Sequence, residues 1–166
     1  MSEGKVYYPV VHTEEILAIL SKIAVFGGLN DRQLHEIFSL LKMLSYAPGE
    51  YVFKQGEAPS CIYIVLTGEV KIIYDIEGVT LELASFGAGD CFGETSVIGI
   101  QSHSSSALAV ATSELIVLEH KALLDIFQTD KELFGLLILN IARETSRRLH
   151  RLDEVVAKYV LSKKDN

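Results

Sequence analysis

The sequence predicts an α+β fold in which an antiparallel β-roll, a jelly-roll-like barrel, is flanked by helices. Two observations favour this fold. Turn residues recur every several positions between residues 43 and 120, and short β-rich runs lie between them. On both sides of this region apolar residues recur at helical spacing instead. Because many short strands at such spacing are typical of sandwiches and barrels, the middle of the chain is expected to form the roll.

Composition limits the class of protein. The length of 166 residues suits one domain, and an apolar content of 49% is ample for a core. The net charge of −7 argues against general nucleic-acid binding. Two cysteines give no disulfide framework, the first residues lack the apolar core of a secretion signal, and no apolar run reaches membrane-spanning length. We therefore expect a soluble cytoplasmic protein with no membrane partner.

The N-terminal part is expected to contain two helices. Residues 1–12 have no periodicity and are predicted to be flexible. Thr13 can cap a first helix. The apolar face of that helix consists of Ile16, Leu17, Leu20 and Ile23. Asn30 begins a second helix, with Gln33 as its capping-box partner. With the roll, these helices make a predicted unit of residues 13–128.

The predicted strands follow from the β-rich runs between the turns. They comprise residues 51–53, 62–66, 70–74, 79–86, 107–111 and 115–118. Residues 79–83 alternate apolar and polar side chains, which predicts a strand with one buried face. After the last strand, residues 121–127 are expected to form a short helix.

Residues 87–106 carry the chemistry of the sequence. Glycines turn the backbone, residues 94–98 can form a short helix, and a loop of small hydroxyl residues follows. Free N–H groups at a helix start, next to hydroxyls, can bind an anion, and an ionised Glu94 can accept from a ligand hydroxyl. The stretch is no dinucleotide fingerprint, which needs glycine in place of Phe92. It is no P-loop, because Gly93 is not followed by Lys and a hydroxyl residue.

The motif Phe92-Gly93-Glu94, followed by a short apolar helix and a strand, resembles the phosphate-binding cassette of cyclic nucleotide-binding domains. The turn glycines Gly49, Gly56 and Gly68 extend the resemblance to roughly residues 26–152. The resemblance implies cAMP or cGMP as ligand and no metal. The cassette residues that it implies as the site are Phe92, Gly93, Glu94, Thr95, Ser96, His103, Ser104 and Ser105.

His103 stands where the family pattern has an arginine. A cyclic phosphate carries one negative charge, which arginine meets with a permanent two-pronged donor. Histidine is mostly neutral at pH 7, and losing a charge-assisted contact costs about 1.5–3 kcal/mol. No arginine lies between Arg32 and Arg143 to replace it. We therefore expect binding of cyclic nucleotides to be weak or absent.

Residues 129–166 are predicted to form a long C-terminal helix and tail. Thr129 is expected to cap it, with Glu132 at the reciprocal position. A heptad seam of apolar and small residues predicts a homodimer through this helix. The seam consists of Ile138, Ala142, Thr145, Leu149, Leu152, Val156 and Tyr159. The alternative, in which the first half packs on the roll and the tail is solvated, stays open.

The family resemblance gives this helix a role. In such domains the long helix covers the nucleotide pocket, which implies that it moves when the cassette fills. Matching Arg147-Arg148-Leu149 to the family's Arg-Arg-Leu puts Leu152 and Asp153 where some relatives contact adenine. The basic residues of the helix are expected to form a solvated face. Relatives that bind DNA carry a helix-turn-helix domain after this helix, for which residues 160–166 are too short, so we expect no direct DNA binding.

The sequence favours a regulatory ligand sensor over an enzyme. The histidines are scattered, no paired set of metal ligands occurs, and no Ser-His-Asp set has a local signature. The predicted function is therefore coupling of a ligand in the cassette to the C-terminal helix and an unknown effector. Two alternatives stay open: a dimeric interaction module that has lost nucleotide binding, and a sensor of another small anion.

Overall fold

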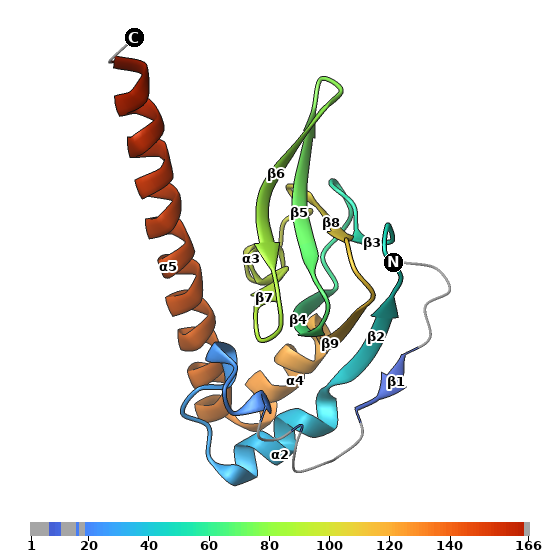
Figure 1. The fold of residues 1–166 in the computed structure, drawn as a ribbon. Coiled ribbons are helices and arrows are strands. Elements are labelled where there is room, and N and C mark those ends of the chain that lie inside the picture. Colours follow the sequence, from blue (N-terminus) through green and yellow to red (C-terminus); the bar gives the residue numbers. More distant parts are fainter. Residues whose placement is uncertain (1–6, 11–15, 17–18, 165–166) are drawn as a thin grey trace.

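The computed structural model describes residues 7–10, 16 and 19–164. Two antiparallel sheets form a roll, and the helices gather beside it (Figure 1). The five-stranded sheet has the order β1 (Tyr8–Pro9), β2 (Lys42–Tyr46), β9 (Ser113–Glu119), β4 (Cys61–Thr67) and β7 (Cys91–Phe92). The four-stranded sheet has the order β3 (Tyr51–Phe53), β8 (Ser106–Ala109), β5 (Val70–Ile76) and β6 (Val79–Phe86). The predicted α+β roll is therefore confirmed.

Strands β4 and β9 are buried on both faces, which explains their nearly continuous apolar sequences. Alternate residues of a strand point to opposite faces. Tyr63 and Val65 of β4 therefore pack in the core between the two sheets, whereas Ile62 and Ile64 pack against the helices. The sheet thus separates an inner core from an outer helical core.

The helices are η1 (Ala24–Phe26), α2 (Asp31–Leu40), α3 (Glu94–Gly99), α4 (His120–Thr129) and α5 (Lys131–Lys164). At the start of α2 the predicted capping box is confirmed: Asn30 Oδ1 accepts from the Gln33 amide at 3.0 Å, and Gln33 Oε1 accepts from the Asn30 amide at 3.1 Å. Of the predicted first helix, Ile16 and Leu20 are helical, whereas Thr13 and Leu17 lie outside the described residues.

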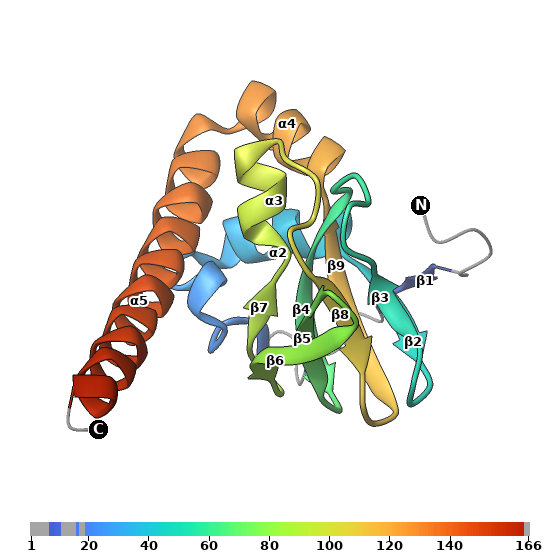
Figure 2. The same cartoon turned by 90° about the horizontal axis from the view of Figure 1, so that it is seen from above.

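The first half of α5 is fixed to the rest of the molecule. Leu133, Leu137 and Ile141 are buried in the outer core. Asn140 donates through its amide nitrogen to the carbonyl oxygens of Val25 at 3.1 Å and Gly27 at 2.7 Å. Beyond these contacts the helix extends past the roll, and its C-terminal half stands away from the sheets (Figures 1 and 2).

Thr129 does not cap the long helix, contrary to the prediction. Helix α4 continues through Thr129, whose hydroxyl donates to the carbonyl oxygen of Asp125 at 2.9 Å. Asp130 takes the capping position instead, since its Oδ1 accepts from the Leu133 amide at 2.9 Å. The two helices thus join through one residue, and the shorter helix predicted for residues 121–127 is extended at both ends.

Strand β6 is not half-buried, contrary to the prediction. Val79, Leu81 and Leu83 are 57%, 47% and 59% exposed. None of these three side chains belongs to either hydrophobic core of the described residues, because the hairpin of β5 and β6 projects beyond the other strands (Figure 1). Three short strands were also missed. They are β1, within a segment predicted to be flexible, β2 and β7.

Candidate ligand-binding site

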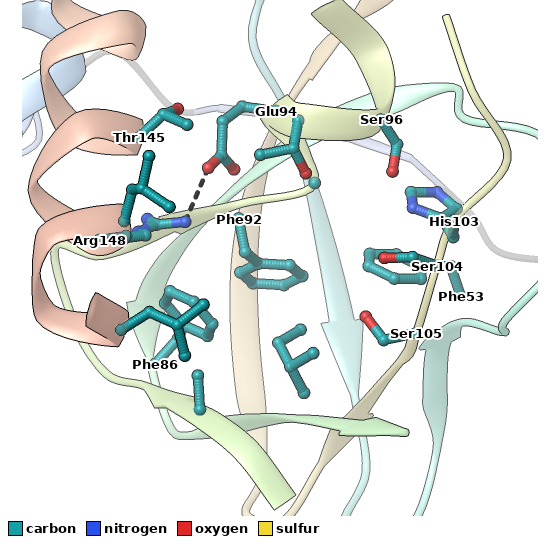
Figure 3. A pocket seen from close by; sticks show the side chains of 16 residues that line it. Phe53, Phe86, Phe92, Glu94, Ser96, His103, Ser104, Ser105, Thr145 and Arg148 are labelled. Atoms are coloured by element: carbon teal, nitrogen blue, oxygen red, sulfur yellow. Dashed lines mark hydrogen bonds and ion pairs between the residues drawn. The ribbon is translucent and has the colours of Figure 1, made fainter. Parts of the chain in front are cut away.

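A cavity of about 310 Å³ lies between the roll, α3 and the middle of α5 (Figure 3). Aromatic and aliphatic residues of the sheets form its floor, the start of α3 and the loop after it form one wall, and α5 forms the other. The predicted site residues that line it are Phe92, Gly93, Glu94, Thr95, Ser96, His103, Ser104, Ser105 and Leu152. Asp153 is exposed and is not among the lining residues, so the structure does not bring it to the cavity.

Gly93 makes the turn between β7 and α3. Its φ of +83° lies in the left-handed region, which favours glycine. A Cβ at this position would lie 3.1 Å from both the Cys61 carbonyl oxygen and Tyr63 Cδ2. Phe92 immediately before it is buried, with its ring stacked on Tyr63 at 5.3 Å. This close approach of backbone to core places Glu94 at the inner end of the cassette helix.

Glu94 is a buried carboxylate in the cavity wall. Its side chain belongs to the first residue of α3, and the residue is 1% exposed. Arg148 Nη1 donates to Glu94 Oε1 at 2.7 Å, whereas Oε2 has no hydrogen-bond partner among the described residues. Burial raises the pKa of Glu94, and the neighbouring Arg148 opposes this by stabilising the ionised form.

Arg148 is the site residue that the sequence prediction missed. It lies on α5, 54 positions after Glu94, and it also donates to the Cys91 carbonyl oxygen. Its guanidinium carbon lies 4.7 Å from the centre of the Phe86 ring, a cation–π distance. Arg148 thus reaches the cassette although no arginine lies between Arg32 and Arg143. The available signal was the Arg-Arg-Leu match, from which only Leu152 and Asp153 were assigned to the site.

His103 forms the far wall of the cavity. The residue is 4% exposed, and its ring stacks on Phe53 with centres 3.6 Å apart and planes 7° apart. Its amide donates to the Glu57 carbonyl oxygen at 2.9 Å, and its own carbonyl accepts from the Gly56 amide at 2.8 Å. Burial lowers the pKa of His103, and the nearby Glu57 carboxylate only partly opposes this. The imidazole is therefore held mainly neutral at pH 7.

The hydroxyl residues divide into two groups. Ser96 is buried beside the cavity, and Ser104 and Ser105 line it from the loop before β8. Ser106 serves the fold instead, because its hydroxyl accepts from the Gln55 amide at 2.9 Å. Thr95 lines the rim with its side chain exposed. The cavity can therefore offer hydroxyl dipoles opposite Glu94.

The described part of the chain contains neither a cluster of metal-ligating side chains nor a helix that could cross a membrane. No group of three His, Cys, Asp or Glu side chains there is arranged to hold a metal ion. Likewise, no helix among those residues has both the length and the apolar character needed to cross a bilayer.

Comparison with known proteins identifies similar domains. A family model described as "Cyclic nucleotide-binding domain" matches residues 43–130. The cyclic nucleotide-gated channel beta-3 of Canis lupus familiaris is 31% identical over 113 residues, which are 66% of this chain and 14% of the channel. The cGMP-dependent protein kinase egl-4 of Caenorhabditis elegans is 25% identical over 126 residues, 75% of this chain and 15% of the kinase. The chain thus spans about one seventh of these relatives.

Solved structures show the same architecture. A cyclic nucleotide-binding domain from Methylobacillus flagellatus superposes with a TM-score of 0.76 and 26% identity, over 87% of this chain and 83% of that one. The catabolite activator protein of Thermus thermophilus gives a TM-score of 0.70 and 28% identity, over 80% of this chain and 61% of that one.

Proposed function

Because the chain belongs to the cyclic nucleotide-binding domain family, we propose that it is a regulatory sensor in which a ligand in the cassette cavity controls the position of α5. The single observation that carries this proposal is the contact between Arg148 and Glu94. It joins the long helix to the residue best placed to accept from a ligand hydroxyl. A hydrogen-bond donor of the ligand therefore either competes with Arg148 for the Glu94 carboxylate or adds a second hydrogen bond to that carboxylate.

The domain acts without catalysis in this proposal. Its relatives include proteins named as cyclic nucleotide-gated channels and a cGMP-dependent kinase, in which the matched portion is a small part of the whole protein. The cavity described here offers one carboxylate, one paired arginine and one neutral histidine. Ligand recognition needs these groups, whereas chemistry on a bound ligand would need a positioned nucleophile or proton-transfer pair. An effector reads the position of α5, and a cytoplasmic location is the one we favour.

A second candidate function rests on the exposed apolar face of α5. Leu149, Leu152, Val156 and Tyr159 are 52–60% exposed and follow heptad spacing. A homodimer through this face would correspond to the dimeric interaction module, which the sequence left open as an alternative function. The two functions are compatible, because a dimer helix can also be the element that a ligand moves.

Calorimetric titration of cAMP and cGMP into the purified chain, combined with hydrogen exchange, tests the sensor. We expect measurable but weak binding at neutral pH, with altered exchange in residues 142–156 of α5. Binding that leaves exchange in α5 unchanged would refute the coupling. If neither the cyclic nucleotides nor their uncharged nucleosides bind, the result would favour the interaction module.

A further inference from the structure

The charges around the cavity balance before any ligand enters. The titratable side chains that line it, among the described residues, are Glu94, His103 and Arg148. Arg148 is committed to the Glu94 carboxylate, the Cys91 carbonyl and the Phe86 ring. His103 is buried against Phe53 and mainly neutral. A cyclic phosphate would therefore bring an extra negative charge into a pocket whose one permanent cation is already paired.

Arg148 cannot move to a phosphate without a large penalty. Glu94 is 1% exposed, and the Arg148 guanidinium is the cation paired with it. Removing a partner from a buried ion pair leaves an uncompensated charge, which is strongly unfavourable. The hydroxyls of Ser104 and Ser105 and the amides of the six-residue helix α3 supply partial charges only. Among the described residues that line the pocket, none is therefore an unpaired cation that could meet a cyclic phosphate.

The wall at Glu94 has the opposite property, because it contains an acceptor with no donor among the described residues. Glu94 Oε2 is buried and has no partner in the part of the chain that the structure describes. An ionised carboxylate only accepts hydrogen bonds, so this oxygen fits a ligand hydroxyl. Elsewhere in the cavity, Phe53, Phe92 and Ile72 provide apolar walls suited to a flat ring. The volume of about 310 Å³ limits the ligand to a small molecule.

We propose that the cavity selects an uncharged, hydroxyl-bearing ligand of the nucleoside class over the corresponding cyclic phosphate. This inference rests on the proposed function, because it takes the cassette cavity as the sensory site. The residues present fit the sugar half of a cyclic nucleotide and do not fit its phosphate. The hydroxyls of Ser104 and Ser105 are adequate partners for a neutral ligand hydroxyl, since neither side then carries a net charge.

The test is a titration of the full chain with matched pairs of ligands at pH 7.5. The probes are adenosine against cAMP, guanosine against cGMP, and each nucleoside against its 2′-deoxy form. We expect at least one nucleoside to bind roughly ten-fold or more tightly than its cyclic phosphate, and loss of the 2′-hydroxyl to weaken it by about one to two decades. The deoxy ligands test the role of Glu94 in the wild-type protein, so this test does not depend on whether a variant folds.

Two variants complete the test. Glu94→Gln should weaken the nucleoside and reduce the penalty for removing its 2′-hydroxyl, while His103→Arg should reverse the preference in favour of the cyclic phosphate. Wild-type protein that binds a cyclic phosphate as tightly as its nucleoside overturns the charge selectivity and leaves the sensor intact. Failure of both wild type and His103→Arg to bind any of these probes overturns the sensor as well.

Discussion

Arg148 of α5 donates a 2.7 Å hydrogen bond to Glu94, the first residue of the cassette helix α3. The contact connects a helix that stands partly away from the roll to a carboxylate buried in the cavity wall. Any group that enters the cavity next to Glu94 therefore changes the electrostatic surroundings of Arg148. Under the proposed function, this contact would carry the effect of a ligand to the helix without a large rearrangement of the sheets.

The Arg148→Ala variant should lose about 3 kcal/mol in the free energy of unfolding, because a buried carboxylate is left without its cation. Arg148 is partly exposed and Glu94 can take up a proton, which places the loss at the low end for buried pairs. Denaturant unfolding at pH 7 measures it. The control is Arg147→Ala: the exposed Arg147 side chain contacts the partly buried Glu144, and this ion pair should be worth at most about 1 kcal/mol. Equal losses in the two variants would contradict the assigned role of Arg148.

Glu94→Gln combined with Arg148→Ala separates pairing from packing. If the main loss in Arg148→Ala is an unpaired charge, then removing the Glu94 charge first should make the arginine substitution markedly less damaging. A double-mutant cycle gives this coupling. Additive effects would mean that Arg148 stabilises the fold through Phe86 and the Cys91 carbonyl instead.

The sequence predicted the parts of this site that depend on local pattern. It missed those that depend on contacts between residues far apart in the sequence. Turn residues located most strands, and the Asn30 box located α2. Periodicity shows which residues share a helix face, but not which surface lies opposite. Arg148 was therefore assigned to solvent, although a buried Glu94 needs a cation. The adjacent residues Thr129 and Asp130 can both cap a helix, and only the three-dimensional joint between α4 and α5 selects Asp130.

The exposed face of β6 has a similar explanation. Alternation in residues 79–83 correctly predicted a strand, because a strand has a period of two. It could not tell whether the apolar face meets a core, since that depends on which elements pack against this face of the sheet. Here Val79, Leu81 and Leu83 lie on strand β6, for which β5 is the one paired neighbour among the described strands.

Gly93→Ala should destabilise the protein more than Gly78→Ala. Both glycines have nearly the same φ, +83° and +80°, in the left-handed region, which costs an alanine about 1 kcal/mol or more. Gly78 has open space around it, whereas a Cβ at Gly93 would lie 3.1 Å from the Cys61 carbonyl oxygen. Denaturant unfolding of both variants therefore isolates the contact from the backbone strain. Equal effects would mean that the cassette turn can shift to admit a methyl group.

The chain should form a homodimer through the heptad face of α5. Apolar residues there are exposed in the single chain, and their burial against a second copy is favourable. Light scattering at roughly tens of micromolar protein should give twice the monomer mass. Val156→Glu should produce the monomer, whereas Leu124→Glu, at an exposed position of α4, should leave the dimer intact. A wild-type monomer at that concentration would contradict the prediction.

Cyclic nucleotide binding should tighten on acidification through His103. In the free protein burial lowers the pKa of His103 below its ordinary value of about 6.5. A bound phosphate favours the imidazolium, so the pKa is higher in the complex and binding takes up a proton. Affinity for cAMP therefore rises as the pH falls through the pKa of the complex and levels off below the pKa of the free protein. Glu57 favours protonation in both states, while the Glu94 carboxylate is already paired with Arg148.

Calorimetry between about pH 5.5 and 8 measures this dependence, and three controls assign it. Adenosine carries no phosphate and should show no such gain. His103→Arg should bind cAMP more tightly at pH 7 and lose most of the pH dependence, whereas His150→Arg, at an exposed position of α5, should retain it.

The lowered pKa of His103 also stabilises the fold above about pH 6.5, and this contribution is lost as the pH falls through the folded-state value. Acidification therefore tightens the phosphate contact while it weakens the free fold, so affinity must be measured where unfolding is negligible. Tight, pH-independent binding of cAMP by the wild type would mean that another group neutralises the phosphate.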